Sequence, residues 1–246
     1  MRTVLALTAT ACLTIAAPAR AQLYRVEFVQ AAPGRLLDLI DLYKARVPVY
    51  AAAGEARPLM TRHSQGDKWD LMILAPIGAS LSEYYSPDRT ARRERAAAAS
   101  GASAEAFEQK LRGLIAWREE MTVRGPMPDV TQAAFDASGF AHLEIFIALP
   151  GMQDALYKER EMENAFARAI GRPVNLIFTR EGGAAWDQFT IGLYKDMVHY
   201  ATSAVVPADV EDRAAKAAGF ESRAAIGPYL RSLIATHHDN LAGIVR

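Results

Sequence analysis

The sequence predicts an α+β fold in which one βαββα unit occurs twice in tandem. The first sign of the duplication is a repeated segment, TRHSQGDKWD at 61–70 and TREGGAAWD at 179–187. Two of the three tryptophans, Trp69 and Trp186, fall in register within it, 117 residues apart.

Flanking segments repeat in the same order. YRVEFVQAAPG at 24–34 matches AHLEIFIALPG at 141–151 with the same offset, and LRGLIA at 111–116 matches LRSLIA at 230–235. A unit of this length is too long for a solenoid repeat and suits two copies of a small domain. We therefore expect a first repeat over 22–130 and a second over 131–246.

The first copy begins with an alternating segment at 23–30, bounded by Ala-Pro-Gly, which predicts a strand. Apolar residues at helical spacing between Gly34 and Gly54 predict a helix, which Pro48 should end or kink early. Two short apolar runs at 57–63 and 69–76, separated by a polar glycine turn, predict a hairpin.

A helical stretch rich in alanine and charge follows and is expected to end with AFEQKLRGLIAWREEM at 106–121. The second copy repeats the pattern. Its expected elements are a strand at 140–148, a helix at 152–170, strands at 174–180 and 186–193, and helices across 195–240. Strand–helix–strand–strand–helix is the split βαβ arrangement, whose sheet needs a covering layer on its second face.

The first 21 residues have the order of a secretory signal peptide: basic Arg2, an apolar run and Ala19-Arg20-Ala21 before Gln22. We expect cleavage near Ala21-Gln22 and a periplasmic or secreted product. Two alternatives stay open, an uncleaved anchor and a lipoprotein signal that ends at Cys12. Cleavage would remove that cysteine, the only one in the chain, and with it any disulfide or thiolate metal ligand.

Charge and hydropathy limit the partners. Removing Arg2 and Arg20 from the 28 basic residues leaves 26 against 28 acidic residues. This balance gives no electrostatic footprint for nucleic acid or anionic lipid. No later apolar segment has the length of a membrane span. A small-molecule ligand is the expected partner, and a homo-oligomer stays open.

The element order and the duplication resemble the dimeric α/β-barrel superfamily, whose unit is ferredoxin-like, in its fused-repeat form. The resemblance covers nearly all of 22–246 and rests on topology, without a diagnostic catalytic motif. It implies an intrachain barrel in which each repeat covers the other's sheet. Its members include antibiotic-biosynthesis-type monooxygenases, heme-degrading oxygenases and chlorite dismutases, so fold alone assigns no chemistry.

Strand alternation separates two faces. We expect one set to meet the helices: Tyr24, Val26, Phe28, Met72, Leu74, Leu143, Ile145, Ile147, Phe189 and Ile191. The other set should face the space between the two sheets: Arg25, Glu27, His142, Glu144, Trp69, Leu71, Ile73, Trp186, Gln188 and Thr190. The second copy places more polar groups in this set and is the better candidate for a ligand site.

Glu144, His142 and Glu27 are the candidate catalytic residues, because paired buried carboxylates acquire different pKa values and can act as acid and base. The alternative is a structural ion pair between each glutamate and a neighbouring basic residue. The candidate ligand-binding residues are Trp186, Gln188, Thr190, Arg180, Trp69 and Arg62.

The repeated Thr-Arg and Trp-Asp pairs also have a structural interpretation, in which arginine and aspartate pair across the hairpin and the indole covers them. Occurrence in both copies favours this inherited hairpin lock.

His199, His237 and His238 are weak candidates for a metal or a heme iron. On the predicted helix the two adjacent histidines point about 100° apart, which disfavours a shared ion. Three functions stay open: a ligand-binding or cofactor-independent monooxygenase-like protein, a non-catalytic association protein, and a heme-binding protein. No motif implies a cofactor.

Overall fold

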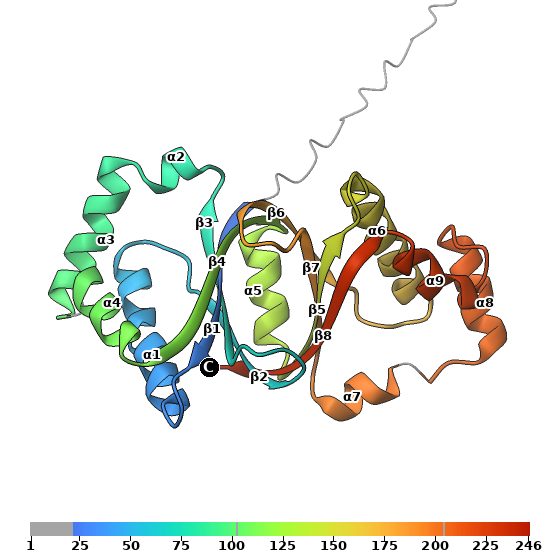
Figure 1. The fold of residues 1–246 in the computed structure, drawn as a ribbon, viewed down its shortest axis with the longest axis horizontal. Coiled ribbons are helices and arrows are strands. Elements are labelled where there is room, and N and C mark those ends of the chain that lie inside the picture. Colours follow the sequence, from blue (N-terminus) through green and yellow to red (C-terminus); the bar gives the residue numbers. More distant parts are fainter. Residues whose placement is uncertain (1–21, 102, 204) are drawn as a thin grey trace, which may run out of the picture.

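A computed structural model describes residues 22–101, 103–203 and 205–246, so the predicted signal peptide lies outside the described residues. The chain forms two repeats with the same element order, shown in Figure 1. The first repeat contains β1 (Gln22–Ala31), α1 (Leu36–Ala52), β2 (Leu59–Gln65), β3 (Leu71–Gly78), α2 (Leu81–Tyr84), α3 (Pro87–Ala99), α4 (Ala104–Arg112) and β4 (Ile115–Gly125).

After the connecting helix α5 (Pro128–Asp136), the second repeat follows the same plan. It contains β5 (Phe140–Ala148), α6 (Gln153–Ala169), β6 (Leu176–Gly183), β7 (Gln188–Tyr194), α7 (Met197–Thr202), α8 (Ala208–Ala217), the 3₁₀ turn η1 (Arg223–Ala225), α9 (Ile226–Arg231) and β8 (Ile234–Val245). Helices α1 and α6 are 17 residues long and start 117 residues apart, as the repeat predicts. The predicted boundary at 130/131 falls within α5.

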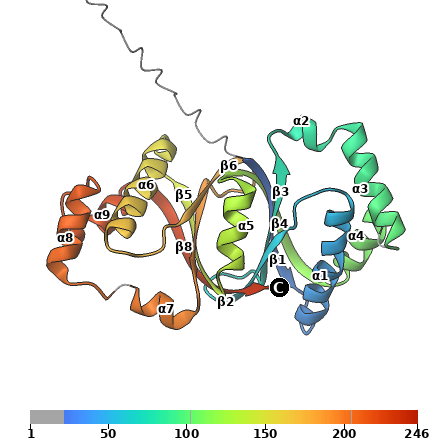
Figure 2. The same cartoon turned by 180° about the vertical axis from the view of Figure 1, so that it is seen from behind.

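The strands close into one barrel in the order β1-β3-β2-β8-β5-β7-β6-β4. Neighbouring strands are antiparallel, and the repeats join at two seams, β2 with β8 and β4 with β6. The helices of each repeat lie outside the barrel on opposite sides, α1 to α4 on one and α6 to α9 on the other (Figures 1 and 2). The predicted dimeric α/β barrel within one chain is confirmed.

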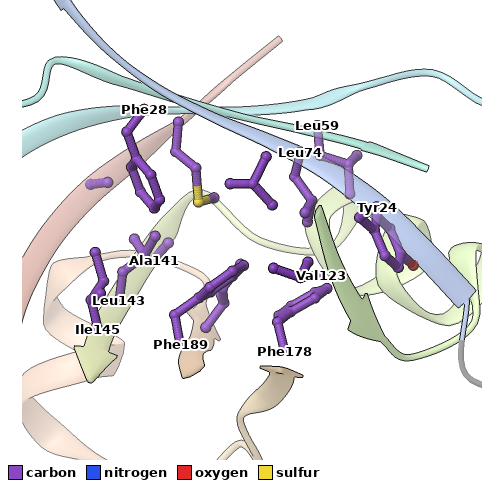
Figure 3. Packing of buried hydrophobic residues seen from close by; sticks show 14 of the residues in the cluster. Tyr24, Phe28, Leu59, Leu74, Val123, Ala141, Leu143, Ile145, Phe178 and Phe189 are labelled. Carbon is purple, nitrogen blue, oxygen red and sulfur yellow. The ribbon is translucent and has the colours of Figure 1, made fainter. Parts of the chain in front are cut away.

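Large side chains from both repeats fill the barrel interior. Tyr24 and Phe28 from the first repeat pack with Phe178 and Phe189 from the second, with ring centroids 5.3 and 6.4 Å apart for Tyr24–Phe178 and Phe28–Phe189. Figure 3 shows strands on opposite sides of the barrel contributing to this cluster. The space between the sheets is thus a hydrophobic core.

The predicted direction of the two strand faces is wrong for most of the residues named. Trp69 and Trp186 are the exceptions, since Trp69 lies in the barrel core and Trp186 packs against it, as predicted. The apolar set that includes Val26, Leu143 and Ile191 points into the barrel. Glu27 and Glu144 point outward, under the helices, where they contact side chains of α1 and α6. Alternation identifies two faces but not which one is enclosed. The more apolar set fills the barrel interior, whereas under the helices each glutamate finds the charged or hydroxyl partners that a buried carboxylate needs.

The predicted C-terminal helices also need correction. Helix α4 ends at Arg112, and residues 115–125 form strand β4; β8 replaces the expected helix in the same way. Each unit is therefore βαββαβ, with the fourth strand next to the first. In β4 the buried residues Met121 and Val123 alternate with charged and polar ones, which fits a strand with one buried face.

Pro48 does not end α1, which continues to Ala52. Beyond the proline, Val49 and Ala53 pack against Ala96 and Ala97 of α3, and this contact supports the last turn. None of the helices in the described ranges is long and apolar enough to cross a membrane.

Candidate functional site

The two predicted glutamates occupy equivalent places, Glu27 on β1 beneath α1 and Glu144 on β5 beneath α6. They do not form a pair, because each belongs to the helix-covered face of its own repeat. Each is instead the centre of a separate charged cluster.

In the first repeat, permanent charges neutralise Glu27. Arg25 Nη2 lies 3.1 Å from Glu27 Oε1, and Arg118 Nη2 lies 3.2 Å from Oε2. The Tyr43 hydroxyl of α1 donates to Oε2 at 2.8 Å. Burial, together with the carboxylate, raises the pKa of Tyr43, so this hydroxyl stays protonated. The first cluster is a buried structural ion pair.

Glu144 has a different set of partners. Its Oε2 lies 3.4 Å from Arg160 Nη1 of α6 and accepts from Thr190 Oγ1 of β7 at 3.2 Å. Its Oε1 lies 3.4 Å from His237 Nε2 of β8. Burial acts to raise the pKa of Glu144, but His237 and Arg160 outweigh it and hold the pKa at about 2. The same contact with Glu144 raises the pKa of His237.

Arg160 connects this glutamate to two more carboxylates on its own helix. Its side chain is 1% exposed, its Nε donates to Glu159 Oε2 at 2.6 Å, and its Nη2 lies 3.0 Å from Glu163 Oε1. Burial raises the pKa of Glu163 to about 7 and raises that of Glu159. One guanidinium therefore balances three carboxylates.

The clusters correspond position by position. With the repeat offset of 117 to 119 residues, the first-repeat side chains Arg25, Tyr43, Arg118 and Glu120 become His142, Arg160, His237 and Asp239. His142 Nε2 lies 2.9 Å from Asp239 Oδ1, and the equivalent contact in the first repeat joins Arg25 Nε and Glu120 Oε1 at 3.8 Å. The second repeat has thus exchanged two arginines for titratable imidazoles.

The adjacent histidines lie on strand β8 and not at a helix end, so they face opposite sides. His237 joins Glu144, whereas His238 Nδ1 pairs with Asp67 Oδ2 at 3.0 Å. His199, on α7, accepts from the Lys195 backbone N–H at 3.2 Å through Nδ1. Of the three predicted metal candidates, only His237 belongs to the cluster.

The repeated Trp-Asp pair locks each hairpin to the first strand of its repeat. Asp70 Oδ2 accepts from the Ala31 backbone N–H at 2.8 Å, and Asp187 Oδ2 accepts from that of Ala148 at 2.9 Å. Arg180 Nη2 donates to Asp187 Oδ1 at 2.7 Å. The predicted arginine–aspartate pair thus forms in the second hairpin.

In the first hairpin, the residue at the place of Arg180 is His63, because each donates its backbone N–H to the carbonyl of the hairpin aspartate. Arg62 is exposed and, within the described residues, has no ion pair with Asp70. The indoles also differ: Trp69 is buried in the barrel core, and Trp186 Nε1 donates to Glu119 at 2.8 Å.

A large cleft opens beside α6 in the second repeat. Its volume is about 1210 Å³, and it lies between α6, strand β6 and the connection from β4 to α5. Its walls include Leu156, Tyr157, Asn164, Ile177 and Met127. At its base lies Gln188 of β7, which is 2% exposed and whose Nε2 has no hydrogen-bond partner among the described residues.

The first repeat has a cleft at the equivalent place, with a volume of about 250 Å³. Lys44 and Met60 line it where Glu161 and Ile177 line the larger one, again 117 residues apart. Arg57, at the smaller cleft, pairs with Asp136 of α5 at 2.6 Å. The residue at the place of Arg57 in the second repeat is Val174, which cannot form this bridge. The second cleft is therefore the more open one.

The predicted site residues divide between these features. Gln188 and Arg180 line the large cleft, while Glu144, His142 and Thr190 belong to the neighbouring cluster. Phe146 links the two: it is the register partner of Gln188 on β5 and stacks on the His237 ring at 4.9 Å. The predicted ligand residues Trp69 and Trp186 are engaged elsewhere.

Sequence reasoning missed Arg160 and its two acidic neighbours on α6. A signal for them was present, because Leu156, Arg160 and Glu163 fall at i, i+4 and i+7, the spacing of a buried helical stripe. Charged residues in such a stripe indicate a buried polar cluster.

The histidines do not provide an axial ligand for a heme in the large cleft. Among the described residues, no histidine lines either cleft. Glu144 and Asp239 flank His237, and His238 and His199 are held by Asp67 and Lys195. We derive no chemistry through heme.

Solved structures with a similar fold exist at low sequence identity. An anthrone oxidase-like protein has a TM-score of 0.58 and 12% identity over 92% of both chains. A proposed monooxygenase from Lactobacillus acidophilus NCFM has a TM-score of 0.52 and 9% identity, over 92% of this chain and 94% of that one. A proposed chlorite dismutase has a TM-score of 0.51 and 10% identity, over 92% and 95%. No protein-family model and no curated protein matches the sequence.

Proposed function

Because the chain has the dimeric α/β-barrel fold in a fused tandem form, we propose that its second repeat binds a small organic molecule in the cleft beside α6. The observation that carries this proposal is the unpaired Nε2 of Gln188 at the base of the cleft. A buried amide donor without a partner costs about 1–3 kcal/mol, which a ligand acceptor would recover.

The ligand we propose has an apolar part and at least one hydrogen-bond acceptor, because the cleft combines apolar wall with charged side chains such as Arg124, Arg168 and Glu161. Leu156, Ile177 and Met127 supply apolar wall, and the acceptor would meet Gln188. A cleft of about 1210 Å³ has room for a tricyclic molecule. Anthrone, a tricyclic ketone, is a suitable probe because an anthrone oxidase-like protein shares the fold.

The first repeat supplies the matched test. Leu71 stands where Gln188 stands in the second repeat, so Gln188→Leu installs a side chain that the fold already accepts at this place. We expect the variant to be folded and at least as stable as wild type, and to bind anthrone at least about 10-fold more weakly, the cost of one hydrogen bond to a buried donor. Isothermal titration measures both affinities.

A second pair of variants tests the location. Glu161→Trp narrows the large cleft, and Lys44→Trp makes the equivalent change beside the small one. We expect only the first to weaken binding. Equal affinity in wild type, Gln188→Leu and Glu161→Trp would reject the cleft, and complete absence of binding would favour the non-catalytic association protein.

Turnover of the bound ligand is the monooxygenase-like form of this proposal. Anthrone and dioxygen would give anthraquinone and water, a balanced four-electron oxidation that an oxygen electrode detects. In this form Glu144 and His142 stay the proposed acid–base residues. Neither lines the cleft, so they would act on the ligand through the cluster that Phe146 joins to Gln188. Glu144→Gln should then abolish oxygen uptake without abolishing binding.

We also propose that the chain is exported. The support is the order of charge, apolar run and small residues in 1–21. Expression with the leader should give a mature chain that starts at Gln22 by intact mass, in the exported fraction. A full-length chain retained in the membrane fraction would support the uncleaved anchor instead.

A further inference from the structure

The first repeat contains a cation between two carboxylates that face each other across neighbouring strands. Glu27 and Glu120 are register partners on β1 and β4. Arg118 Nη2 lies between them, 3.2 Å from Glu27 Oε2 and 2.8 Å from Glu120 Oε2. Directly opposite like charges destabilise a sheet, so this guanidinium stabilises the pair.

The second repeat keeps the two carboxylates but lacks the guanidinium. Glu144 and Asp239 are register partners on β5 and β8, and the residue at the place of Arg118 is His237. His237 is shorter, and its Nε2 lies 3.4 Å from Glu144 Oε1 and 3.6 Å from Asp239 Oδ2. This nitrogen is buried and has no hydrogen-bond partner among the described residues.

These separations are long for hydrogen bonds but suit ligands of one metal ion. Zinc binds imidazole nitrogen and carboxylate oxygen at about 2.0–2.2 Å, and a tetrahedron with such bonds has edges of about 3.3–3.6 Å. One ligand atom from each of Glu144, His237 and Asp239 lies within 4.8 Å of the other two. The Asp239 side chain is 58% exposed, and its rotation would shorten the longest of these separations.

The surroundings favour a cation. Arg160 is shared with Glu159 and Glu163 and meets Glu144 through Oε2, which leaves Oε1 directed to His237. His142 Nε2 lies 2.9 Å from Asp239 Oδ1 and would orient this carboxylate from behind. Such imidazole–carboxylate contacts commonly fix metal ligands.

We propose that Glu144, His237 and Asp239 bind one divalent transition-metal ion of the zinc type, which takes the role that Arg118 has in the first repeat. Mixed nitrogen and oxygen donors favour such an ion over magnesium or calcium, which prefer oxygen ligands alone. The three protein ligands, one of which is the exposed Asp239, leave a fourth coordination position for water.

Cobalt(II) is the probe, because its visible spectrum reports coordination number. The untagged full chain is treated with chelator, dialysed and titrated with Co²⁺, and Zn²⁺ is then added as competitor. We expect one Co²⁺ per chain, the intense visible bands of a four-coordinate site, and loss of these bands with one equivalent of Zn²⁺.

The first variant copies the residue of the first repeat. His237→Arg places a guanidinium where the first repeat has Arg118. We expect this variant to bind Co²⁺ at least 100-fold more weakly, so that no stoichiometric binding is seen, and to retain its thermal unfolding transition. Asp239→Asn, at an exposed carboxylate, should also lose binding without loss of the fold. His238→Asn is the control, since His238 faces the other side of β8 and pairs with Asp67.

The wild-type result decides first: absence of stoichiometric binding overturns the proposal. So does unchanged binding in His237→Arg or Asp239→Asn, or loss of binding in His238→Asn alone. Failure of the metal site leaves ligand binding in the cleft untouched, because none of the three metal ligands lines the cleft. Only the turnover form of the proposed function shares a residue with the metal site, namely Glu144.

Discussion

Arg160→Met should destabilise the protein by about 3–5 kcal/mol at pH 8, the cost of leaving buried charges without their partner. Arg160 is the fully buried cation of the second cluster, and three carboxylates contact its guanidinium. Methionine fills a similar volume but supplies no charge and no donor. Chemical denaturation with chelator present measures the loss.

The cost should depend on pH, and its sign follows from Glu159 and Glu163. Their pKa values are already raised in the fold, to about 7 for Glu163, and loss of Arg160 raises them further. A carboxyl group whose pKa is raised on folding binds its proton more tightly in the native state, so stability falls as pH rises from about 4.5 through the folded value. The deficit of Arg160→Met relative to wild type should therefore shrink at pH 5.

Arg213→Met is the matched control. Arg213 pairs with Asp209 at 2.7 Å on the exposed surface of α8, where solvent screens the pair and its contribution to stability is small. We expect Arg213→Met to lower the free energy of unfolding by no more than this small contribution, both at pH 8 and at pH 5. A loss below about 1 kcal/mol in Arg160→Met at pH 8, or an equal loss at both pH values, would contradict a buried charge cluster.

The duplication made the fold predictable from this one sequence. Matched landmarks such as Trp69 and Trp186 located the repeat, and alternation located the first three strands of each unit. Strand β4 was missed because its segment 117–120, Trp-Arg-Glu-Glu, suits an exposed helix as well as a half-exposed strand. Only pairing with β1, which is a long-range contact, selects the strand.

The site was predictable only in part, for a similar reason. Residue types pointed to Glu144, His142 and His237, but periodicity could not show that the helix-covered face holds the charges. The cleft depends on the distance between α6 and the connection to α5, and the sequence of neither segment determines that distance. The absence of the Arg57 bridge in the second repeat became meaningful only once the clefts could be compared.

The second large loss of stability is expected at the two seams that close the barrel. Gly66 directly follows strand β2 and Gly183 ends the equivalent strand β6, with φ of +129° and +99°. A Cβ on Gly183 would lie 2.7 Å from the Glu120 carbonyl oxygen of β4, and one on Gly66 would meet the Asp239 carbonyl of β8. Each glycine thus permits close approach to the fourth strand of the other repeat.

Gly66→Ala and Gly183→Ala should each destabilise the protein by about 3–5 kcal/mol, from left-handed backbone strain plus the clash with a strand that cannot move without opening the seam. Gly34→Ala and Gly151→Ala are the controls, because these glycines have φ of +76° and +80° but nothing within 4 Å of an added Cβ. They should lose only the backbone component, about 1–2 kcal/mol. Equal losses at all four positions, measured by denaturation, would show that the seams tolerate separation. A larger loss at 66 and 183 would mean that barrel closure depends on these two contacts, which hold each repeat's sheet over the core of the other.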